Sequence, residues 1–448
     1  MRALSLTDHL FLLLEHQQPM HIAVVCLFRL PRAQSLDNFI PPLLDTIYRS
    51  SAAPTYPFNQ VLYRKVYWRS VSRIDIDKHF FYHTLQENAG NAELLAHLSN
   101  LHSQPLALTR PMWQLHLIDG LAPSDGQARF AIYLKIHHAL VDGIGGMRVL
   151  RAALSEDPQA LLTAPFWALI KPQKAHNPPP KSTAIKPLSS LANITKALYK
   201  RWQERHLISF TSSFAAPPSA LNTAIDGSRR LAIRSYNKAR FTRIAQAFAV
   251  NGNDVVLAVC AGALARYLAT HYQLPTRPLV GFVPISLRDD DGLAGNRLSF
   301  LLSNLATDVA DRQARLLAIS QSMQDSKARI AGLNYNEIIG YSLAIYAATG
   351  ANLLTGLLPT RQGFNLIISN TPGNAKPLYL NGAILEGVYP ASVLLQGQAL
   401  NITLVNYAGN LDFAITACDS VLHDSDSLLD LIADELDSYE QLASAQAN

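Results

Sequence analysis

Residues 135–146 read KIHHALVDGIGG, in which two adjacent histidines are followed by three apolar residues, Asp-Gly and two further glycines. The stretch comes after an alternating apolar run over residues 130–136 (FAIYLKI), which is typical of a strand with one buried face. A side chain at the end of a strand can point into a cleft, and the unperturbed pKa of histidine, about 6.5, lies near neutral pH. His138 is therefore a candidate general base.

Asp142 follows His138 by four residues. A fixed carboxylate at this place can hold the turn by pairing with an arginine, or it can select the imidazole tautomer directly. We expect Gly143 to let the backbone leave the strand tightly, and Gly145 and Gly146 to allow close packing at the start of the next helical stretch.

Three other interpretations of the motif stay open at this point. A metal site could use His137, His138 and Asp142, although adjacent histidines on a strand point to opposite faces. The histidine pair could be purely structural. The third interpretation is a nucleophilic triad, but the sequence contains no G-x-S-x-G elbow and no reactive-cysteine signature to support it.

Composition limits the class of protein. A chain of 448 residues predicts two domains of about 200 residues each. Apolar residues make up 49% and charged residues 16%, so the apolar surplus must form core, a long apolar cavity or surface that meets lipid. A formal net charge of +5 suits an anionic membrane or a phosphate-bearing ligand. Nucleic-acid binding is not indicated, because the sequence lacks clustered aromatic and arginine residues.

The cysteines and apolar segments indicate a cytoplasmic protein. The chain has an odd number of cysteines, and the three are widely spaced: Cys26, Cys260 and Cys418. This predicts buried reduced thiols rather than disulfides or a zinc site. Residues 1–21 lack the long apolar region and cleavage site of a signal peptide. Residues 338–360 are uncharged but diluted by glycine and polar residues, which predicts a buried helix rather than a membrane span.

The chain divides into residues 1–159, a basic Pro-rich linker over 160–219, and residues 220–448. Both halves mix strand-like and helical patterns, which predicts an α/β fold or α+β layers. In the second half we predict strands at 277–286, 363–369, 399–407 and 411–417, and helices at 254–271, capped by Asp254, and at 425–443, capped by Ser425.

The linker region has no Asp or Glu between positions 159 and 203 but seven Lys or Arg residues. Phe166, Trp167 and Trp202 flank its Pro-rich centre. Such a basic stretch with aromatics could lie on anionic lipid, or it could be a solvated crossover between the halves.

The stretch HHALVDGIGG carries the HHxxxDG signature of the CoA-dependent acyltransferase superfamily, which includes chloramphenicol acetyltransferase-like enzymes and peptide-synthetase condensation domains. Further motifs are QQPMH at 17–21, RPMWQLHLIDG at 110–120, NDVVLAV at 253–259, VPISLR at 283–288 and ISNTPG at 368–373. Together they closely resemble the bacterial wax ester synthase/acyl-CoA:diacylglycerol acyltransferase family, and the resemblance is collinear over nearly the whole chain.

This resemblance implies two chloramphenicol acetyltransferase-like subdomains joined by a crossover linker, with an active-site channel between them. It implies an O-acyltransferase that moves a long-chain acyl group from acyl-CoA, as co-substrate, to a fatty alcohol, a diacylglycerol or both. No cofactor and no metal ion are implied. The implied location is cytoplasmic, at the inner face of the plasma membrane and on lipid inclusions.

Within the HHxxxDG motif, the resemblance implies that His138 is the general base that deprotonates the acceptor hydroxyl. Asp142 would be its structural companion, which in the superfamily usually pairs with an arginine, and Arg288 is our candidate for that arginine. His137, which we expect to face away from the reaction, and Gly143 complete the motif.

Outside that motif, Pro111 and Trp113 match the family's PLW element, with Met112 as a volume-conserving replacement for leucine. Asn253 and Asp254 match its Asn-Asp element, and Asn253 is a candidate donor to the oxyanion. Each of these residues could instead serve packing or a turn.

Ser369 and Asn370 match the family's SNVPG element, with Thr371 in place of valine and Asn374 where proline is common. Glu15 matches an acidic position near the N-terminus. The tentative substrate-binding residues are Glu15, Pro111, Trp113, Ser369 and Asn370.

Two alternative functions remain open. The chain could acylate another lipid, glycolipid or polyketide alcohol. It could also be a lipid-droplet protein that binds lipid without catalysis, although the complete HHxxxDG motif speaks against a decayed site.

Overall fold

The structure is a computed structural model that describes residues 1–170, six residues between 195 and 203, residues 216–286 and residues 298–446, with Ala33 and Asn334 excepted. The Pro-rich centre of the predicted linker and Arg288 lie outside the described residues.

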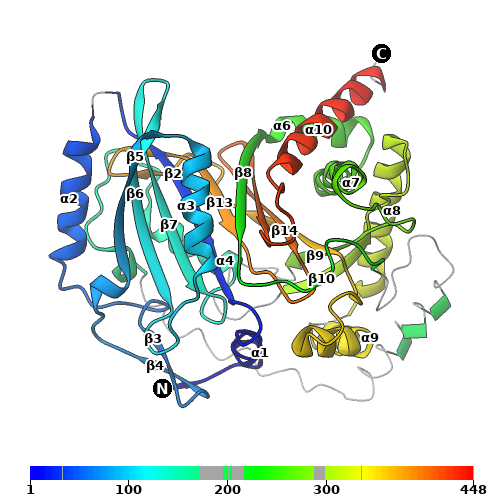
Figure 1. The fold of residues 1–448 in the computed structure, drawn as a ribbon, viewed down its shortest axis with the longest axis horizontal. Coiled ribbons are helices and arrows are strands. Elements are labelled where there is room, and N and C mark those ends of the chain that lie inside the picture. Colours follow the sequence, from blue (N-terminus) through cyan, green and yellow to red (C-terminus); the bar gives the residue numbers. More distant parts are fainter. Residues whose placement is uncertain are drawn as a thin grey trace.

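The first sheet lies at the left of Figure 1 and has the strand order β12-β13-β2-β7-β6-β5. Its strands are β12 (Tyr379–Leu380), β13 (Ala383–Ala391), β2 (His21–Arg29), β7 (Gln127–His137), β6 (Trp113–Ser124) and β5 (Phe80–Ala89). Neighbours are antiparallel except for the parallel pair β5 and β6.

Both faces of this sheet are covered, which explains the dense apolar sequence of its central strands. Along β2, Cys26 and Phe28 belong to the core under helix α2 (Leu36–Tyr48). Val25 and Leu27 point the other way, into the core under helix α3 (Asn91–Ser103).

The second sheet has the order β10-β9-β11-β14-β15-β8. Its strands are β10 (Leu298–Asn304), β9 (Val280–Ser286), β11 (Leu366–Pro372), β14 (Leu400–Tyr407), β15 (Asn410–Ala417) and β8 (Arg230–Asn237). The pairs β9–β11 and β11–β14 are parallel and the others antiparallel.

Four helices cover or flank the second sheet at the right of Figure 1: α6 (Lys238–Ala247), α7 (Gly252–His271), α8 (Arg312–Ile330) and α10 (Ser427–Gln446). Helix α7 is apolar almost all round because it runs through the middle of the second core. Among the helices that the structure describes, it is the one with the length and apolarity to cross a membrane. Its apolar window is 78% buried in the fold, as in a core helix.

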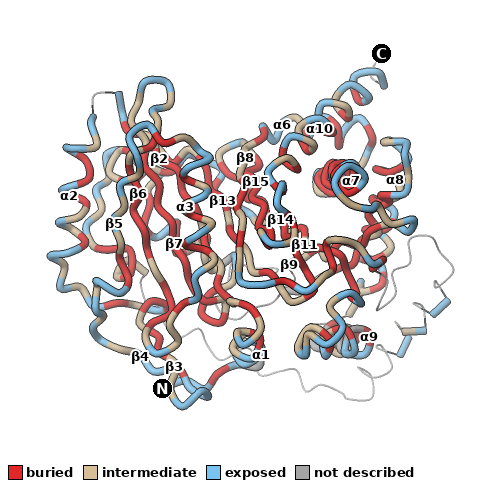
Figure 2. The backbone as a smooth tube through the Cα atoms, viewed as in Figure 1, coloured by how far each residue is buried: buried red, intermediate tan, exposed pale blue. Residues whose placement is uncertain are grey.

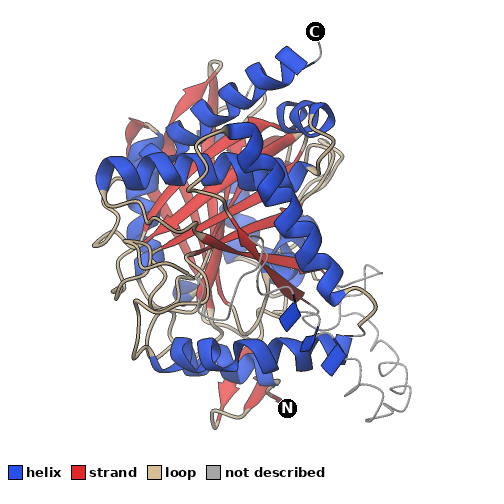
Figure 3. Cartoon of the chain, turned by 90° about the vertical axis from the view of Figure 1, so that its right-hand side faces the viewer, coloured by secondary structure: helices blue, strands red, loops and turns tan. Residues whose placement is uncertain are grey.

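The N-terminal region adds a small third sheet of β1 (Arg2–Ala3), β4 (Tyr67–Ser70) and β3 (Gln60–Tyr63), next to helix α1 (Leu6–Leu14). Short 3-10 turns lie at η1 (Ile76–Lys78) and η2 (Phe166–Ala168), and helix α4 (Gly143–Ala153) follows β7. Figures 1 and 3 place α1 and helix α9 (Tyr335–Thr355) at the same end of the molecule.

Strand β13 comes from the C-terminal half but pairs with β2 of the first sheet, with Ala391 opposite Ala23. We did not predict this crossing. It means that residues 220–448 contribute strands to both sheets, so the two halves of the sequence do not correspond one to one with the two sheets.

A buried carboxylate joins the two sheets. Asp412 on β15 is fully buried and accepts hydrogen bonds from the Val388 backbone N–H of β13 (2.8 Å) and from the Ser235 hydroxyl of β8 (2.5 Å). Ser235 in turn lies 2.8 Å from the Tyr389 hydroxyl. Burial raises the pKa of Asp412 to about 6, since a charged carboxylate loses hydration there.

The mixed α/β architecture and the four predicted strands of the second half are confirmed, with the hairpin formed by β14 and β15. The predicted helix caps are wrong. Asn251 is the N-cap of α7, and Asp254 occupies the third helical position, where it completes a capping box. Ser425 precedes α10, but its buried hydroxyl has no hydrogen-bond partner among the described residues.

Two expectations about surface and interior need correction. Phe166 and Trp167 do not lie on the surface, as an interfacial role would require, because both are buried in the first core. Helix α9 is not buried throughout: Ile338, Tyr341 and Ile345 are buried, but its opposite face is open to solvent (Figure 2). All three cysteines are free and buried, as predicted.

Candidate active site

His138 follows the last residue of β7 and is held by its backbone. Its N–H donates to the carbonyl of Met20 (2.8 Å), just as the preceding His137 N–H donates to the carbonyl of Met112 (2.9 Å). The end of β7 is thus fixed from both sides, by the segment before β2 and by the start of β6. This fixes the position from which the His138 side chain projects.

His137 and His138 have different environments. His137 is fully buried, and its Nδ1 accepts a hydrogen bond from the Ala139 N–H (3.1 Å). The proton of this ring is therefore on Nε2, which donates to the carboxylate of Glu15 (3.2 Å). Both ring nitrogens of His137 therefore form hydrogen bonds within the protein.

Glu15 links the two histidines. The same carboxylate oxygen that accepts from His137 also accepts from the backbone N–H of Met20 (2.5 Å), whose carbonyl holds His138. The family resemblance of the sequence suggested Glu15 as a tentative substrate-binding residue. Its position indicates instead that it orients the segment carrying the base.

The Nδ1 atom of His138 is buried and has no hydrogen-bond partner within the described part of the chain. The ring of Phe11 is stacked on the imidazole, with centroids 4.1 Å apart and planes at 20°. Burial lowers the pKa of His138 to about 4, an effect that outweighs the opposing field of Asp142. The ring is therefore neutral at pH 7 and able to accept a proton.

We did not predict Phe11 as part of the site. The only signal in the sequence is an apolar run before Glu15, and such a run predicts a helix with a buried face without specifying what that face covers.

Asp142 is the N-cap of α4, and its carboxylate accepts the Gly145 N–H at 2.6 Å. This geometry fits a carboxylate that shapes the turn, as the motif suggested. The predicted pairing with Arg288 stays a prediction, because that arginine lies outside the described residues.

Glycine is needed sterically at 145 rather than at 143. A Cβ at Gly145 would lie 3.0 Å from the Val141 side chain and 3.1 Å from the capping oxygen of Asp142. A Cβ at Gly143 would meet Thr371 only at 3.9 Å, and neither glycine has a positive φ. The tight exit that we expected from Gly143 is therefore not what the backbone requires there.

The proximity of Gly143 to Thr371 brings the HHxxxDG turn against β11 of the second sheet. The neighbouring Asn370 is exposed, and its amide donates to the side-chain oxygen of Asn253 at the start of α7 (3.4 Å). Two of the predicted motifs, 117 residues apart, are thus in contact. Because the Asn253 oxygen is occupied in this pairing, its amide N–H₂ group remains to donate.

Asp254 has a structural position. It is buried, accepts from the backbone N–H of Asn251 (3.3 Å) and accepts from the Ser320 hydroxyl of α8 (2.8 Å). These bonds fix the start of α7, which carries Asn253. Ser369 lies in β11 opposite Thr403 of β14, next to Asn370.

Trp113 is buried in the first core, where its indole N–H donates to the Phe58 carbonyl (2.9 Å) and its ring stacks on His79. Pro111 is buried beside it. We therefore correct their tentative assignment as substrate contacts: both support the start of β6, next to the segment that holds His137.

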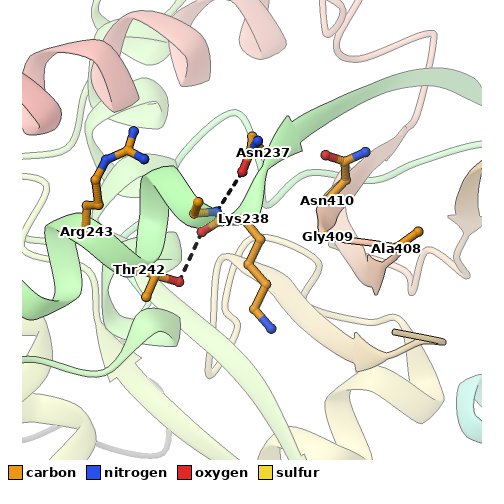
Figure 4. A pocket seen from close by; sticks show the side chains of 8 residues that line it. Asn237, Lys238, Thr242, Arg243, Ala408, Gly409 and Asn410 are labelled. Carbon is orange, nitrogen blue, oxygen red and sulfur yellow. Dashed lines mark hydrogen bonds between the residues drawn. The ribbon is translucent and has the colours of Figure 1, made fainter. Parts of the chain in front are cut away.

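Figure 4 shows a surface depression lined by Asn237, Lys238, Ala239, Thr242, Arg243, Ala408, Gly409 and Asn410. Asn237 points back to cap α6 through the Ala239 N–H (2.8 Å), and Thr242 bonds the Lys238 carbonyl (3.2 Å). None of the sequence-predicted site residues lines it, so it is not part of the candidate site. Within the described residues, no group of three or more His, Cys, Asp and Glu side chains could hold a metal ion.

Comparison with protein families gives two matches. Residues 4–256 match the wax ester synthase/diacylglycerol acyltransferase catalytic domain, and residues 294–440 match the WS/DGAT C-terminal domain. The O-acyltransferase WSD of Acinetobacter baylyi is 39% identical over 457 residues, which cover 100% of this chain and 98% of that protein. A probable diacylglycerol O-acyltransferase (tgs2) of Mycobacterium tuberculosis is 35% identical, over 97% of this chain and 98% of its own.

Among solved structures, the wax ester synthase/diacylglycerol acyltransferase from Marinobacter aquaeolei VT8 superimposes with a TM-score of 0.81 at 35% identity, covering 99% of this chain and 100% of its own. The starter condensation domain of rhizomide synthetase RzmA, as a mutant in complex with C8-CoA and Leu-SNAC, has a TM-score of 0.56 at 15% identity, covering 99% of this chain and 94% of its own. That second likeness concerns the fold alone.

Proposed function

Because the chain belongs to the wax ester synthase/diacylglycerol acyltransferase family and is an acyltransferase, we propose that His138 is its general base. In this proposal the enzyme moves a long-chain acyl group from acyl-CoA to the hydroxyl of a fatty alcohol or a diacylglycerol. One observation carries the assignment: His138 follows directly on the end of β7 in the HHxxxDG motif, and its buried Nδ1 has no hydrogen-bond partner among the described residues. Burial lowers its pKa to about 4, which favours the neutral ring that a base requires.

The reaction needs one proton acceptor and no covalent enzyme intermediate. His138 removes the hydroxyl proton while the alcohol oxygen attacks the thioester carbonyl. The tetrahedral adduct then collapses, the C–S bond breaks, and the imidazolium returns the proton to the CoA thiolate. The products are one ester and one free CoA, so the base is regenerated in each cycle.

The developing oxyanion needs donors, and Asn253 is our candidate. Its amide is oriented by Asn370 so that the N–H₂ group is left over, and the start of α7 that carries it is anchored by Asp254. Loss of one such donor typically lowers kcat by about 10²–10³-fold.

We further propose that the substrates reach the base through a channel between the two sheets, and that no cofactor or metal ion takes part, since the proton cycle is complete without one. We place the enzyme in the cytoplasm, at the inner face of the plasma membrane and on lipid inclusions. Acyl-CoA is water-soluble at its CoA end, whereas both acceptors are lipids. The enzyme would therefore work at the boundary between water and lipid.

The test is release of free CoA, followed with a thiol reagent, for a panel of hexadecanol, diacylglycerol and other lipid alcohols. We expect His138→Ala to lose at least about 10²-fold in kcat/KM while it keeps the wild-type melting temperature within a few degrees. A matched control is His9→Ala, an exposed histidine on α1. Near-normal turnover by a folded His138→Ala protein would remove the base assignment.

The same panel separates the alternatives. If only another class of lipid alcohol releases CoA, the acceptor assignment is wrong while acyl transfer stands. Lipid binding without CoA release for any acceptor would favour the non-catalytic lipid-droplet protein.

A further inference from the structure

The N-terminus, α1 and α9 lie at one end of the molecule (Figures 1 and 3), and many of the exposed apolar side chains belong to the elements at this end. We call this end the α1–α9 face; it consists of residues 1–3, Tyr56, α1, the β3–β4 hairpin, and α9 with residues 356–361. Of the fifteen exposed large apolar side chains in the described residues, eight are here: Met1, Leu10, Leu13, Tyr56, Val66, Tyr67, Leu357 and Leu358. Leu357 is 77% exposed and Leu13 is 56% exposed, which is costly in water.

Hydrogen bonds show that these elements form one continuous surface. The Trp68 indole of β4 donates to Asp8 of α1 (2.8 Å), and the Leu4 N–H donates to the Val66 carbonyl at the tip of the hairpin (3.1 Å). On the other side of α1, the Gln17 amide donates to the Leu354 carbonyl of α9.

The charges of this face have one sign. Arg64, Lys65, Arg69 and Arg361 are exposed on the hairpin and after α9. The acids of α1, the hairpin and residues 335–361 are Asp8 and Glu337, and neither is exposed: Asp8 accepts from Trp68, and Glu337 is 3% exposed. Apolar side chains surrounded by cations suit the acyl chains and anionic headgroups of a lipid surface.

The same charges disfavour a second copy of this chain as the occupant. In a two-fold symmetric contact, each patch meets itself, so Arg64, Lys65 and Arg361 would face other cations. A lipid surface with anionic headgroups has no such conflict.

This face is connected directly to the candidate base. Leu10 and Leu13 lie three residues apart on the outer side of α1, whereas Phe11, on its inner side, is stacked on His138. Glu15, at the C-cap of α1, bonds His137. A helix with its side chains is about 10 Å thick, so α1 alone separates its exposed leucines from the ring that it covers.

We propose that the α1–α9 face docks on an anionic lipid surface and that α1 lies between this surface and His138, so that a lipid-borne acceptor is taken up next to the base. The delivery step rests on the proposed acyl transfer, whereas the docking step does not and names the face by which the proposed membrane location would be reached.

Docking is tested by flotation of the full chain with vesicles of phosphatidylcholine, with and without phosphatidylglycerol. We expect binding that requires phosphatidylglycerol and weakens with salt. Leu13→Glu combined with Leu357→Glu should reduce binding at least tenfold, and Arg64→Glu with Lys65→Glu should reduce it by about fivefold for each cation removed. The matched control is Leu317→Glu combined with Leu442→Glu, two exposed leucines on α8 and α10.

Delivery is tested by CoA release from two acceptors. With diacylglycerol in the vesicles, we expect the Leu13→Glu/Leu357→Glu protein to lose at least tenfold in rate. With a water-soluble short-chain alcohol, we expect its kcat and KM to equal those of the wild type.

Each contrary result has a definite meaning. Wild-type binding by the double variant, or equal loss of activity with both acceptors, overturns the inference. A dimer in sedimentation velocity that the double variant abolishes makes the face an interface between copies and also overturns it. CoA release by a wild type that never floats removes docking and the proposed membrane location but leaves the proposed acyl transfer standing. Flotation without CoA release for any acceptor supports docking and removes the proposed function.

Discussion

The ring of Phe11 lies stacked on the imidazole of His138, so that one apolar side chain covers one face of the candidate base. This contact contributes to the burial that keeps the His138 pKa near 4 rather than near 6.5. The base is therefore unprotonated over the whole physiological range, at the cost of a weaker proton affinity.

Phe11→Ala should admit water to the ring and raise the His138 pKa toward 6.5. A base works in its neutral form, so activity is lost as the pH falls through its pKa. If the pKa reaches 6.5, kcat/KM with a water-soluble alcohol should fall about fourfold between pH 8 and pH 6, whereas the wild type should change little over that range. Leu13→Ala, on the outer side of the same helix, is the control. An unchanged pH profile in Phe11→Ala would show that the stacked ring does not set the pKa.

Glu15→Gln should lower kcat by about 10-fold to 10²-fold with little change in KM for acyl-CoA, because Glu15 positions the base without contacting substrate. A glutamine can put its amide oxygen where the shared carboxylate oxygen accepts from His137 and Met20, but it lacks the negative charge that strengthens both hydrogen bonds. Glu15→Ala should lower kcat further than Glu15→Gln does. The control is Asp8→Asn, an acid on the same helix that bonds Trp68. A rise in KM at constant kcat would instead make Glu15 a substrate contact.

Gly145→Ala and Gly146→Ala form a matched pair. The new methyl group at 145 would press on Val141 and displace the Asp142 carboxylate from its cap, which should cost about 1 kcal/mol of unfolding free energy and lower kcat. At 146 the nearest atom is 3.9 Å away, so alanine should be neutral or stabilising by up to about 1 kcal/mol. Urea denaturation and CoA release measure both effects. Equal behaviour of the two variants would show that the cap geometry is unimportant.

Buried histidines should make the protein labile in acid. Burial lowers the pKa values of His102 and His116 to about 3, so the folded protein excludes protons that the unfolded chain binds below about pH 6.5. Their contribution is fully present above pH 6.5 and is lost as the pH falls toward 3, by up to about 1.4 kcal/mol per pH unit for each. His116→Gln should therefore show a shallower fall of unfolding free energy between pH 6 and pH 4, and the exposed His9→Gln should not. Parallel curves for His116→Gln and the wild type would contradict this.

The parts of the site that the sequence predicted are those whose signal is local. Residues 135–146 contain the strand end, the base and the capping carboxylate in one continuous stretch, and their geometry follows from strand and cap rules. The cap of α7 was misplaced because Asn251 and Asp254 are both good cap residues three positions apart, and a capping box uses both.

The contact of Asn253 with Asn370 was beyond prediction, because a single sequence does not show which strand end meets which helix start. The same holds for β13: its apolar residues would satisfy either sheet, and only packing of the whole chain decides. For residues 338–360, which include most of α9, the absence of charge suggested burial, whereas the small and apolar outer side chains are compatible with exposure at a lipid surface.

The pairing of β13 with β2 also bears on biosynthesis. When residues 1–159 of the nascent chain have emerged from the ribosome, β2, β5, β6 and β7 are present. The strand that covers the free edge of β2, β13, ends only at residue 391. Until then the nascent chain presents an open hydrogen-bonding edge, a surface prone to pairing with other chains. The N-terminal half expressed alone should therefore need a chaperone or a supplied β13 peptide to stay in solution, and the enzyme becomes complete only near the end of translation.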